Sequence, residues 1–510
     1  MGAALVVTGA GAWLAATSYA TPARTALVGG NVPVDAGATD PRDISANNSP
    51  TLARSPVDEA RLAIANRVDS PRFSCALHVS SDGGATWDRL DIPLPDGEEP
   101  KCFAPDVAFG KDGTLYVSFV TLKGLGNVPN AVWITTAAAG SEQLTAPTKV
   151  GGPLQFQVRL AADPNTPGLL YLSWVQAQAT GLLAFAETGN PVLLSRSDDG
   201  GRSWGDPVRV SDPARLRVVA PSSAVGPDGQ LFLLYLDLGD DRLDYAGAHE
   251  GRGGEPYDGP WRLVLARSAD KGATWTEAVV AGRLVPTERF VVFLPPSPSL
   301  AVDRRGAVYV AFVDGRLGDA DVWLWRSRDG RSWAPPVRVN DTRQHDATSQ
   351  YLPKIALAPD GRLDVVYYDR RRDRSNLNND VSLQSSFDGG RTFTPSTRLS
   401  DRSFSSQVGF GSERGLADLG SRLGLIAVDR RAMAVWTDTR AGTEASRKQD
   451  LVRAVVDVRR PRDLPEPFDG AIAAAGAIAT GFGMALLAAG VIGRRPRLEP
   501  IAPGGGSDDE

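Results

Sequence analysis

Histidine and cysteine are scarce in this chain, whose 510 residues include three histidines and two cysteines. So few histidines argue against a histidine-rich zinc site, and we assign no metal ligand from them. An excess of basic charge is also missing, because the formal net charge is −5. The sequence therefore carries no electrostatic footprint for nucleic acid. The hydrophobic content of 42% and the charged content of 23% are ordinary for a globular protein.

The two cysteines permit a single disulfide. Cys75 and Cys102 lie 27 residues apart, and disulfides persist in exported proteins. We expect a Cys75–Cys102 bridge that links the first repeated unit of the chain to the second. The alternative is two buried thiols.

Charge is missing from the first 23 residues. This stretch is rich in Ala, Val and Leu, and its Ser18-Tyr19-Ala20 has the small-x-small form of a signal-peptidase site. No Lys or Arg precedes the apolar run. We expect residues 1–23 to be a signal peptide, and the alternative is an uncleaved N-terminal anchor helix.

Residues 470–493 form a second uncharged stretch, which Arg494, Arg495 and Arg497 follow directly. A run of this length can span a bilayer as one helix, and the basic cluster should stay in the cytoplasm. We predict a Pro-rich linker at 461–469, a transmembrane helix at 470–493 and a cytoplasmic tail at 494–510. The chain would then be a single-pass protein of the cell membrane with its large domain outside. A buried helix rich in Ala and Gly is the alternative.

One short pattern, S-x-D-x-G-x-x-W, recurs along the large domain. Three copies are complete, a fourth is one residue short, and a fifth ends in Phe; they occupy 80–87, 197–204, 268–275, 327–333 and 386–393. Asp and Ser can hydrogen-bond the backbone of a tight turn, and Gly supplies the positive φ that such a turn needs. Repeats of this period indicate a repeat architecture.

These residues resemble the Asp-box (BNR) repeat of sialidase-superfamily β-propellers, of the bacterial secreted sialidase-like type. The resemblance implies that the boxes lie on turns between the third and fourth strands of a blade, away from the ligand face. It implies a structural role for Asp82, Asp199, Asp270, Asp329 and Asp388. The terminal aromatics should be buried plugs beneath each hairpin: Trp87, Trp204, Trp275, Trp333 and Phe393.

A second repeat, a pair of short alternating strands, predicts the number of blades. The second strands of these pairs centre near Ala63, Val117, Leu172, Leu233, Val310, Val366 and Val435. We predict an all-β, sialidase-type propeller of seven four-stranded blades over residues 24–460. The alternative is the six blades of true sialidases. The segment 24–34 could supply the last strand and close the ring, which would remove an open sheet edge.

Loops between the second and third strands share one face of such a propeller with the connections between blades, and we name this the connection face. Three of these loops begin with Asp-x-Arg: Asp314 with Arg316, Asp369 with Arg371, and Asp438 with Arg440. The arginines could grip a carboxylate or sugar hydroxyls by bidentate hydrogen bonds. Alternatively, each Asp–Arg pair fixes its own loop, and the threefold recurrence favours this interpretation. The blade connections add four further ligand candidates: Glu288, His345, Tyr351 and Glu413.

The catalytic residues of sialidases cannot be placed on this chain. The family resemblance implies an arginine triad, a Tyr–Glu nucleophile pair, an Asp acid/base and an early Arg-Ile-Pro motif. This chain has no Arg-Ile-Pro and reads Asn47-Asn48-Ser49-Pro50 in its first unit. The catalytic residues, if there are any, therefore stay unknown.

Calcium is the single ion that the sequence leaves open, because oxygen ligands cluster in two loops. One loop holds Asn376, Asn378, Asn379 and Asp380, and the other spans 237–244. Neither follows a defined calcium-loop pattern, so solvated polar loops are the favoured interpretation. No other cofactor is expected.

Function rests on fold analogy at this point. We expect a membrane-anchored, extracellular propeller that binds a glycan or another cell-envelope component without sialidase turnover. The alternative is a glycoside hydrolase, exo-sialidase-like, that acts on extracellular glycans. A structural envelope protein with no small ligand is a third possibility.

Overall fold

Short apolar runs bounded by turn residues form the strands of this protein. The run Leu231–Asp237 is an example, because all of its side chains are buried. A strand that is apolar along its whole length is buried on both faces, as in a stack of sheets. The computed structural model describes residues 26–460 except 41, 182–183, 242–258, 288–296 and 410–418.

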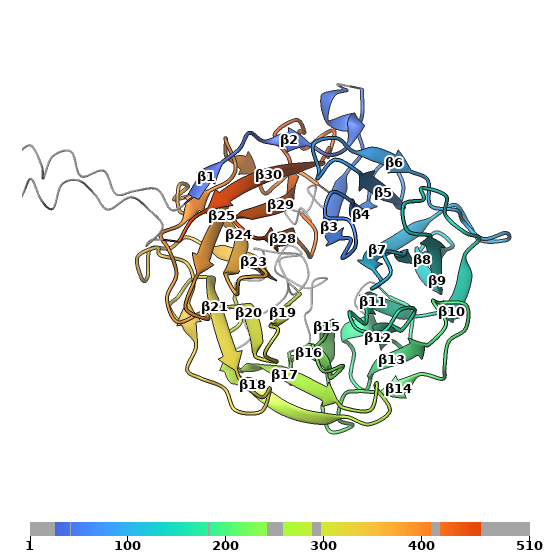
Figure 1. Cartoon of the computed structure of the whole chain (residues 1–510). Coiled ribbons are helices and arrows are strands. Elements are labelled where there is room, and N and C mark those ends of the chain that lie inside the picture. The colour runs from blue at the N-terminus through green and yellow to red at the C-terminus, as the bar shows by residue number, and fades with distance from the viewer. Residues whose placement is uncertain are drawn as a thin grey trace, which may run out of the picture. The chain divides into compact units, whose positions relative to one another are not determined.

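Seven antiparallel sheets are arranged as the blades of a propeller around a central axis (Figure 1). In each blade the first strand lies nearest the axis and the fourth lies at the rim. Blades 1 and 2 comprise β3 (Asn47–Arg54), β4 (Leu62–Val68), β5 (Ser74–Ser80), β6 (Asp88–Leu90), β7 (Cys102–Phe109), β8 (Leu115–Lys123), β9 (Val128–Ala137) and β10 (Thr148–Gly151). Blades 3 and 4 comprise β11 (Gln155–Ala162), β12 (Leu170–Gln176), β13 (Val192–Ser197), β14 (Val208–Arg209), β15 (Val218–Val225), β16 (Leu231–Asp237), β17 (Trp261–Ser268) and β18 (Thr276–Leu284).

Blades 5 to 7 continue the same order around the ring. They comprise β19 (Ser299–Val302), β20 (Val308–Asp314), β21 (Asp321–Ser327), β22 (Val337–Arg338), β23 (Gln350–Leu357), β24 (Leu363–Asp369), β25 (Asn378–Ser386), β26 (Thr397–Arg398), β28 (Gly424–Val428), β29 (Arg431–Asp438) and β30 (Asp450–Val458). The short strand β27 (Phe404–Ser405) pairs with β25. Two short 3₁₀ helices, η1 (Ala36–Thr39) and η2 (Ala184–Ala186), lie in the connections. The prediction of seven four-stranded blades is confirmed.

The start of the described chain closes the ring at blade 7. Strands β1 (Ala26–Val28) and β2 (Val32–Pro33) both pair with β30, with Ala26 opposite Val458 and Val32 opposite Arg453. The outer edge of the last blade is therefore covered by a segment more than 400 residues away in the sequence. This confirms the predicted role of residues 24–34 for the part that the structure describes.

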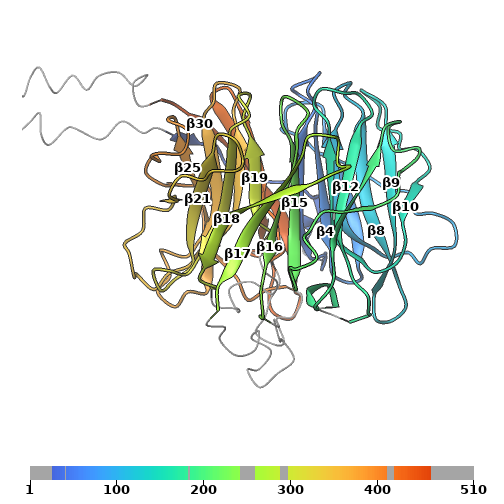
Figure 2. The same ribbon diagram turned by 90° about the horizontal axis from the view of Figure 1, so that it is seen from below.

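The hydrophobic core lies between neighbouring blades, where the buried second and third strands face one another. The strands run between two opposite faces of the ring (Figure 2). One is the connection face. The other carries the S-x-D-x-G turns, and we name it the turn face.

The five repeated turns, which we name the aspartate turns, share a hydrogen bond from the serine hydroxyl to the aspartate. In the first, Ser80 Oγ donates to Asp82 Oδ1 at 2.8 Å, and Gly84 N donates to Ser80 Oγ at 2.8 Å. Thr86 Oγ1 donates to Asp82 Oδ2 at 2.6 Å. In the second, hydrogen bonds from the side chain and backbone of Ser203 lower the pKa of Asp199 to about 2. Each aspartate is thus engaged by its own turn.

The aromatic residues of these turns are less buried than predicted. The five side chains are half-buried, and each packs against the hydrophobic core: Trp87, Trp204, Trp275, Trp333 and Phe393. Trp204 Nε1 also donates to Gly201 O at 3.2 Å, which holds the indole against its own turn. Because the turn lies at the surface, part of each aromatic side chain stays in contact with solvent. The aromatics thus pack beneath their turns as predicted, but their burial is only partial.

A disulfide joins Cys75 to Cys102, as predicted, with their Cα atoms 5.4 Å apart. It links β5 of blade 1 to β7 of blade 2. Among the described residues, no helix has the length and apolar character needed to cross a membrane. The predicted signal peptide at 1–23, the linker at 461–469, the transmembrane helix at 470–493 and the tail at 494–510 lie outside the described residues.

Candidate functional site

The innermost strands of five blades share a β-bulge at the same place. In each, one residue has a left-handed backbone with φ between 47° and 56°: Ser49, Ala104, Gln157, Ala220 and Leu352. The strand register shifts at each of these points. A non-glycine residue with positive φ is uncommon and often accompanies a functional site. A bulge changes the direction in which the following side chains point.

The residue two positions after each bulge lines a central cavity. Blades 5 and 7 supply an equivalent residue, so that seven side chains, one from each blade, form what we name the channel belt: Thr51, Asp106, Arg159, Ser222, Ser299, Lys354 and Arg422. The cavity has a volume of about 220 Å³. Each blade therefore delivers one polar or charged group to the axis of the propeller.

The channel belt contains three cations and one carboxylate. Asp106 accepts backbone hydrogen bonds from Val107 N at 3.0 Å and Leu160 N at 3.1 Å, the second from the next blade. Its Oδ1 lies 3.5 Å from Nη1 of Arg422. This carboxylate offsets one of the cations, so the belt keeps an excess of positive charge.

Several cationic donors of the belt have no hydrogen-bond acceptor among the described residues. Arg422 Nη2 donates to Pro105 O at 2.8 Å, but the buried Nε and Nη1 of Arg422 make no hydrogen bond. Within the same part of the chain, Lys354 Nζ has neither a hydrogen bond nor an ion pair. Arg159 is better satisfied, because its Nη1 reaches Val158 O and its Nη2 reaches Ser297 Oγ, each at 2.9 Å. Buried donors without acceptors are costly, and a ligand could supply the acceptors.

Burial, with repulsion between neighbouring cations, lowers the pKa of two cations of the belt. Burial, and then repulsion from Arg422, lowers the pKa of Arg159 to about 9, against the opposing effect of Asp106. Burial also lowers the pKa of Lys354; Asp106 opposes this shift, whereas Arg422 and Arg159 add to it. An anion in the channel would reverse these shifts, because an opposite charge nearby favours the charged form.

The three Asp-x-Arg loops of the connection face do not converge on the channel, and none of their six residues lines its cavity. Each arginine is held by its own aspartate: Arg316 Nε donates to Asp314 Oδ2 at 3.0 Å, Arg371 Nε to Asp369 Oδ2 at 2.6 Å, and Arg440 Nε to Asp438 Oδ1 at 2.9 Å. Arg316 also lies over the ring of Trp323, with its guanidinium carbon 4.6 Å from the ring centroid. This geometry suits the interpretation that each pair fixes its loop.

The candidates from the blade connections are dispersed. Tyr351 is buried, and its hydroxyl donates to Asn379 Oδ1 at 2.9 Å and accepts from Arg370 Nη2 at 3.2 Å. His345 is exposed and does not line the channel cavity. Glu288 and Glu413 lie outside the described residues.

A Tyr–Glu pair that was not predicted from the sequence occurs in blade 4. The Tyr235 hydroxyl donates to Glu277 Oε1, and Arg215 Nε donates to Glu277 Oε2 at 2.8 Å. Tyr235 is fully buried, and Glu277 also accepts a hydrogen bond from Asp212 N at 2.9 Å. None of these residues lines the channel cavity. The pair is therefore part of the packing between strands.

The two loops considered for calcium use their oxygens internally. Asn379 Oδ1 accepts from Tyr351 and Arg370, and Asp380 Oδ1 accepts from Arg398 Nε at 2.9 Å. In the second loop, Asp237 is paired with Arg215 at 3.1 Å, and 242–258 lie outside the described residues. The described parts of both loops are ordinary polar loops.

A wider hollow of about 1230 Å³ lies on the turn face, between blades 5 and 6 and the end of β3. Arginines and aspartates alternate along its wall, among them Arg305, Arg328, Asp329 and Arg391, and all four are exposed. Exposed charges of mixed sign are solvated by water and interact weakly. The channel belt differs because its charges are buried or half-buried, with one sign in excess.

The channel belt was missed by the sequence analysis, although a signal exists. In five of the innermost strands a proline precedes the belt residue, as in Pro105-Asp106 and Pro353-Lys354. Alignment of the units on that proline would have brought the belt residues of five blades into register.

No known family model matches the sequence, and no curated protein matches it significantly. Solved structures with a related fold include a Dyadobacter fermentans protein of unknown function, which is 14% identical with a TM-score of 0.48 over 85% of this chain and 100% of that one. A Hadza microbial sialidase is 14% identical, with a TM-score of 0.43 over 77% of this chain and 73% of its own. The endosialidase of phage phi92 is 10% identical, with a TM-score of 0.49 over 85% of this chain and 69% of its own. Similarity this low carries no inference about what the present chain binds.

Proposed function

We propose that this protein is a binding propeller that takes the acid group of a glycan into its central channel. The observation that carries the proposal is the channel belt, with three cations, one carboxylate and cationic donors that lack acceptors among the described residues. Charge-assisted hydrogen bonds to a carboxylate are stronger than neutral ones. An anion is therefore the ligand that best completes this site.

An acidic sugar fits the other residues of the channel belt. Thr51, Ser222 and Ser299 place three hydroxyls beside the cations, and such groups exchange hydrogen bonds with sugar hydroxyls. The cavity of about 220 Å³ is smaller than the roughly 300–1,000 Å³ typical of drug-sized ligands. It would accept one acidic residue of a glycan, with the remainder of the glycan outside the channel.

Export and membrane anchoring are part of the same proposal. The Cys75–Cys102 disulfide suits an oxidising compartment. The uncharged stretch 470–493 with the following arginines suits a single membrane span whose C-terminus stays in the cytoplasm. The propeller would thus face the glycans or other envelope components outside the cell.

Calorimetric titration with free acidic sugars tests the proposal. N-acetylneuraminic acid and glucuronic acid should bind, and glucose should not. Lys354→Met should weaken binding about tenfold or more, since a hydrogen bond to a charged group contributes about 1.5–3 kcal/mol. It should not destabilise the fold, because it removes a half-buried cation that has no acceptor among the described residues.

Arg316→Gln is the matched control, because Arg316 lies on the connection face but outside the cavity. It should leave affinity unchanged. Equal affinity of the wild type for glucose and glucuronic acid, or unchanged affinity in Lys354→Met, would refute the proposal.

A further inference from the structure

In blades 5 and 6, an aspartate near the start of the third strand is bound by an arginine and a neutral donor. Asp321 Oδ1 accepts from Arg338 Nη1 at 3.3 Å and from Asn340 Nδ2 at 2.7 Å. In blade 6, Asp380 Oδ1 accepts from Arg398 Nη2 at 2.6 Å and from Ser400 Oγ at 3.0 Å. In both blades the outer strand thus supplies an arginine and, two residues later, a neutral donor.

Blade 7 has the same acid, Asp450, but a different outer strand. The equivalence of positions follows from the backbone. Val322 N donates to Asn340 Oδ1 at 2.8 Å and Val381 N to Ser400 Oγ at 3.1 Å. In the same way Leu451 N donates to Asp35 Oδ1 at 2.7 Å. Asp35 therefore occupies the position of the neutral donor.

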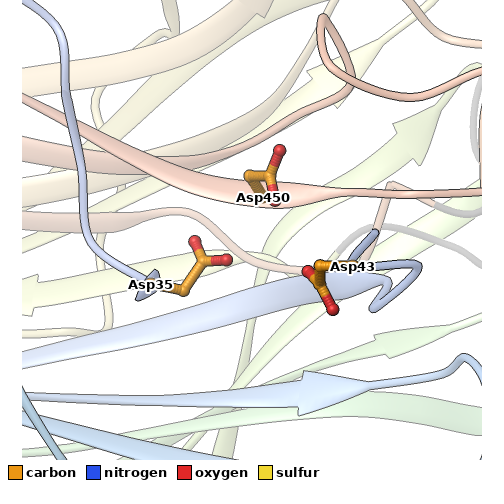
Figure 3. Close-up of side chains that lie close together, drawn as sticks. All are labelled: Asp35, Asp43 and Asp450. Atoms are coloured by element: carbon orange, nitrogen blue, oxygen red, sulfur yellow. The ribbon is translucent and has the colours of Figure 1, made fainter. Parts of the chain in front are cut away.

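The position of the arginine, two residues earlier, is occupied by Pro33. In blade 7 the acid has thus lost its arginine and faces a second acid. Asp43 adds a third, and carboxylate oxygens of Asp35, Asp43 and Asp450 all lie within 4.8 Å of one another. Figure 3 shows these side chains reaching a common space from the N-terminal segment and from β30.

The carboxylate of Asp450 is the least satisfied of the three. Asp450 is 4% exposed, and among the described residues its buried Oδ1 makes no hydrogen bond. The buried Oδ2 of Asp43 also lacks a hydrogen bond. Gly37 permits the close approach of Asp43, because a Cβ at position 37 would collide with that same Oδ2. Buried carboxylates without partners need a compensating charge.

Lys448 supplies only part of that charge. Its Nζ donates to Gly37 O at 2.6 Å and Asp40 O at 2.9 Å. It lies 3.7 Å from Asp450 Oδ1 and 3.8 Å from Asp43 Oδ2, beyond ordinary hydrogen-bond distance. One ammonium cannot balance the charge of three ionised carboxylates.

We propose that Asp35, Asp43 and Asp450 bind one divalent cation of the size of Ca²⁺, which takes the place of the missing arginine. Ca²⁺ binds oxygen ligands at about 2.3–2.6 Å, so two ligands on opposite sides of the ion lie up to about 5 Å apart. The 4.8 Å spread of these oxygens fits within such a sphere. Mg²⁺, with ligands at about 2.0–2.1 Å, would require them to move closer together.

The ion would stabilise the propeller ring where the N-terminal segment closes it on blade 7. Asp35 and Asp43 belong to the segment that follows β2, and Asp450 begins β30, the strand with which β1 and β2 pair. The site is thus distinct from the channel belt and independent of what the channel binds. Its role is to hold the N-terminal segment on blade 7.

Calcium binding by the full chain, after chelation and dialysis, tests the inference. Equilibrium dialysis should find one high-affinity Ca²⁺ site in the wild type and none in Asp450→Asn. Ca²⁺ should also raise the Tm of the wild type more than Mg²⁺ does. In the chelator, Asp450→Asn should melt at or above the wild-type Tm, because it removes a charge from an acidic cluster. A variant that removed an ordinary stabilising contact would melt lower.

Asp321→Asn is the matched control, since it changes the equivalent acid of blade 5. It should lower the Tm by weakening the contact with Arg338, and it should keep the full Ca²⁺ response. Asp43→Asn, at a half-buried loop position, should lose the response like Asp450→Asn and serves if the latter fails to fold. No Ca²⁺ binding by the wild type at millimolar concentration, or an unchanged response in both cluster variants, would overturn the inference.

Discussion

Burial changes the pKa of single side chains in this propeller. His78 on β5, which belongs to neither proposed site, is an example. It is 3% exposed, and its Nε2 makes no hydrogen bond within the described chain. Burial, and then repulsion from Arg89, lowers the pKa of His78 to about 4. The imidazole is therefore neutral in the folded protein at physiological pH.

The lowered pKa of His78 predicts that part of the unfolding free energy is lost at acidic pH. The unfolded chain, with an ordinary histidine pKa of about 6.5, takes up the proton before the folded chain does. The contribution is complete above pH 6.5 and is lost as the pH falls from there to about 4. The difference in unfolding free energy between wild type and His78→Leu should change by about 3 kcal/mol over that range. Denaturant titrations at both pH values would measure it, and a constant difference would contradict the assignment.

The half-buried tryptophans of the aspartate turns should contribute less than those of the core. Trp174 is 1% exposed, and its replacement by Ala should cost about 3–5 kcal/mol as a large core truncation. Trp204→Ala should cost about 1–3 kcal/mol, because only part of its apolar surface is removed from water. Thermal or denaturant melts of the two variants would compare them, and equal losses would mean that the turn aromatic is as important as a core residue.

At the scale of elements, strands and turns were predictable because local chemistry determines them. The alternation in runs such as Leu363–Asp369 and the Ser-Asp-Gly turns predicted seven blades without any long-range information. The direction of the belt side chains was not predictable in this way, because it depends on a β-bulge. Positive φ is normally signalled by glycine, but the bulges have other residues there, such as Ser49 and Ala104. The cluster of Asp35 with Asp450 depends on ring closure, which places residues of the two chain ends side by side.

The disulfide between β5 and β7 should stabilise blades 1 and 2 mainly through the unfolded state. For a loop of 27 residues the chain-entropy estimate is about 3.5 kcal/mol. Replacing both Cys75 and Cys102 by Ser should therefore lower the unfolding free energy by about 2–4 kcal/mol. Mass spectrometry of the native protein should find no free thiol. Both thiols free, or a double variant as stable as the wild type under oxidising conditions, would count against the bridge.

At the scale of the whole molecule, the charge of the channel opposes that of the chain. The formal net charge is −5, whereas the channel belt carries cations in excess. An anionic ligand is therefore repelled weakly at a distance and attracted at the axis. Screening by salt acts mainly on exposed charges, so the attraction inside the buried channel should persist at physiological ionic strength.

The same arrangement predicts that the protein releases no sialic acid. Glycoside hydrolysis generally uses two carboxylates on either side of the scissile bond. In the described part of the channel, Asp106 is the single acid, and backbone amides and Arg422 already engage its two oxygens. The Tyr235–Glu277 pair lies within blade 4 and does not line the channel cavity.

Purified protein should therefore leave a fluorogenic sialoside intact while it binds the free acidic sugar. Arg371→Ala should lower the Tm without changing that binding, because Arg371 holds Asp369 and Asp341 rather than a ligand. Asp106→Asn is the decisive variant, since it removes the only acid of the described channel and keeps its shape. Hydrolysis above the rate without enzyme that is abolished in Asp106→Asn, with the fold intact, would show that the protein is a glycosidase and not only a binding propeller.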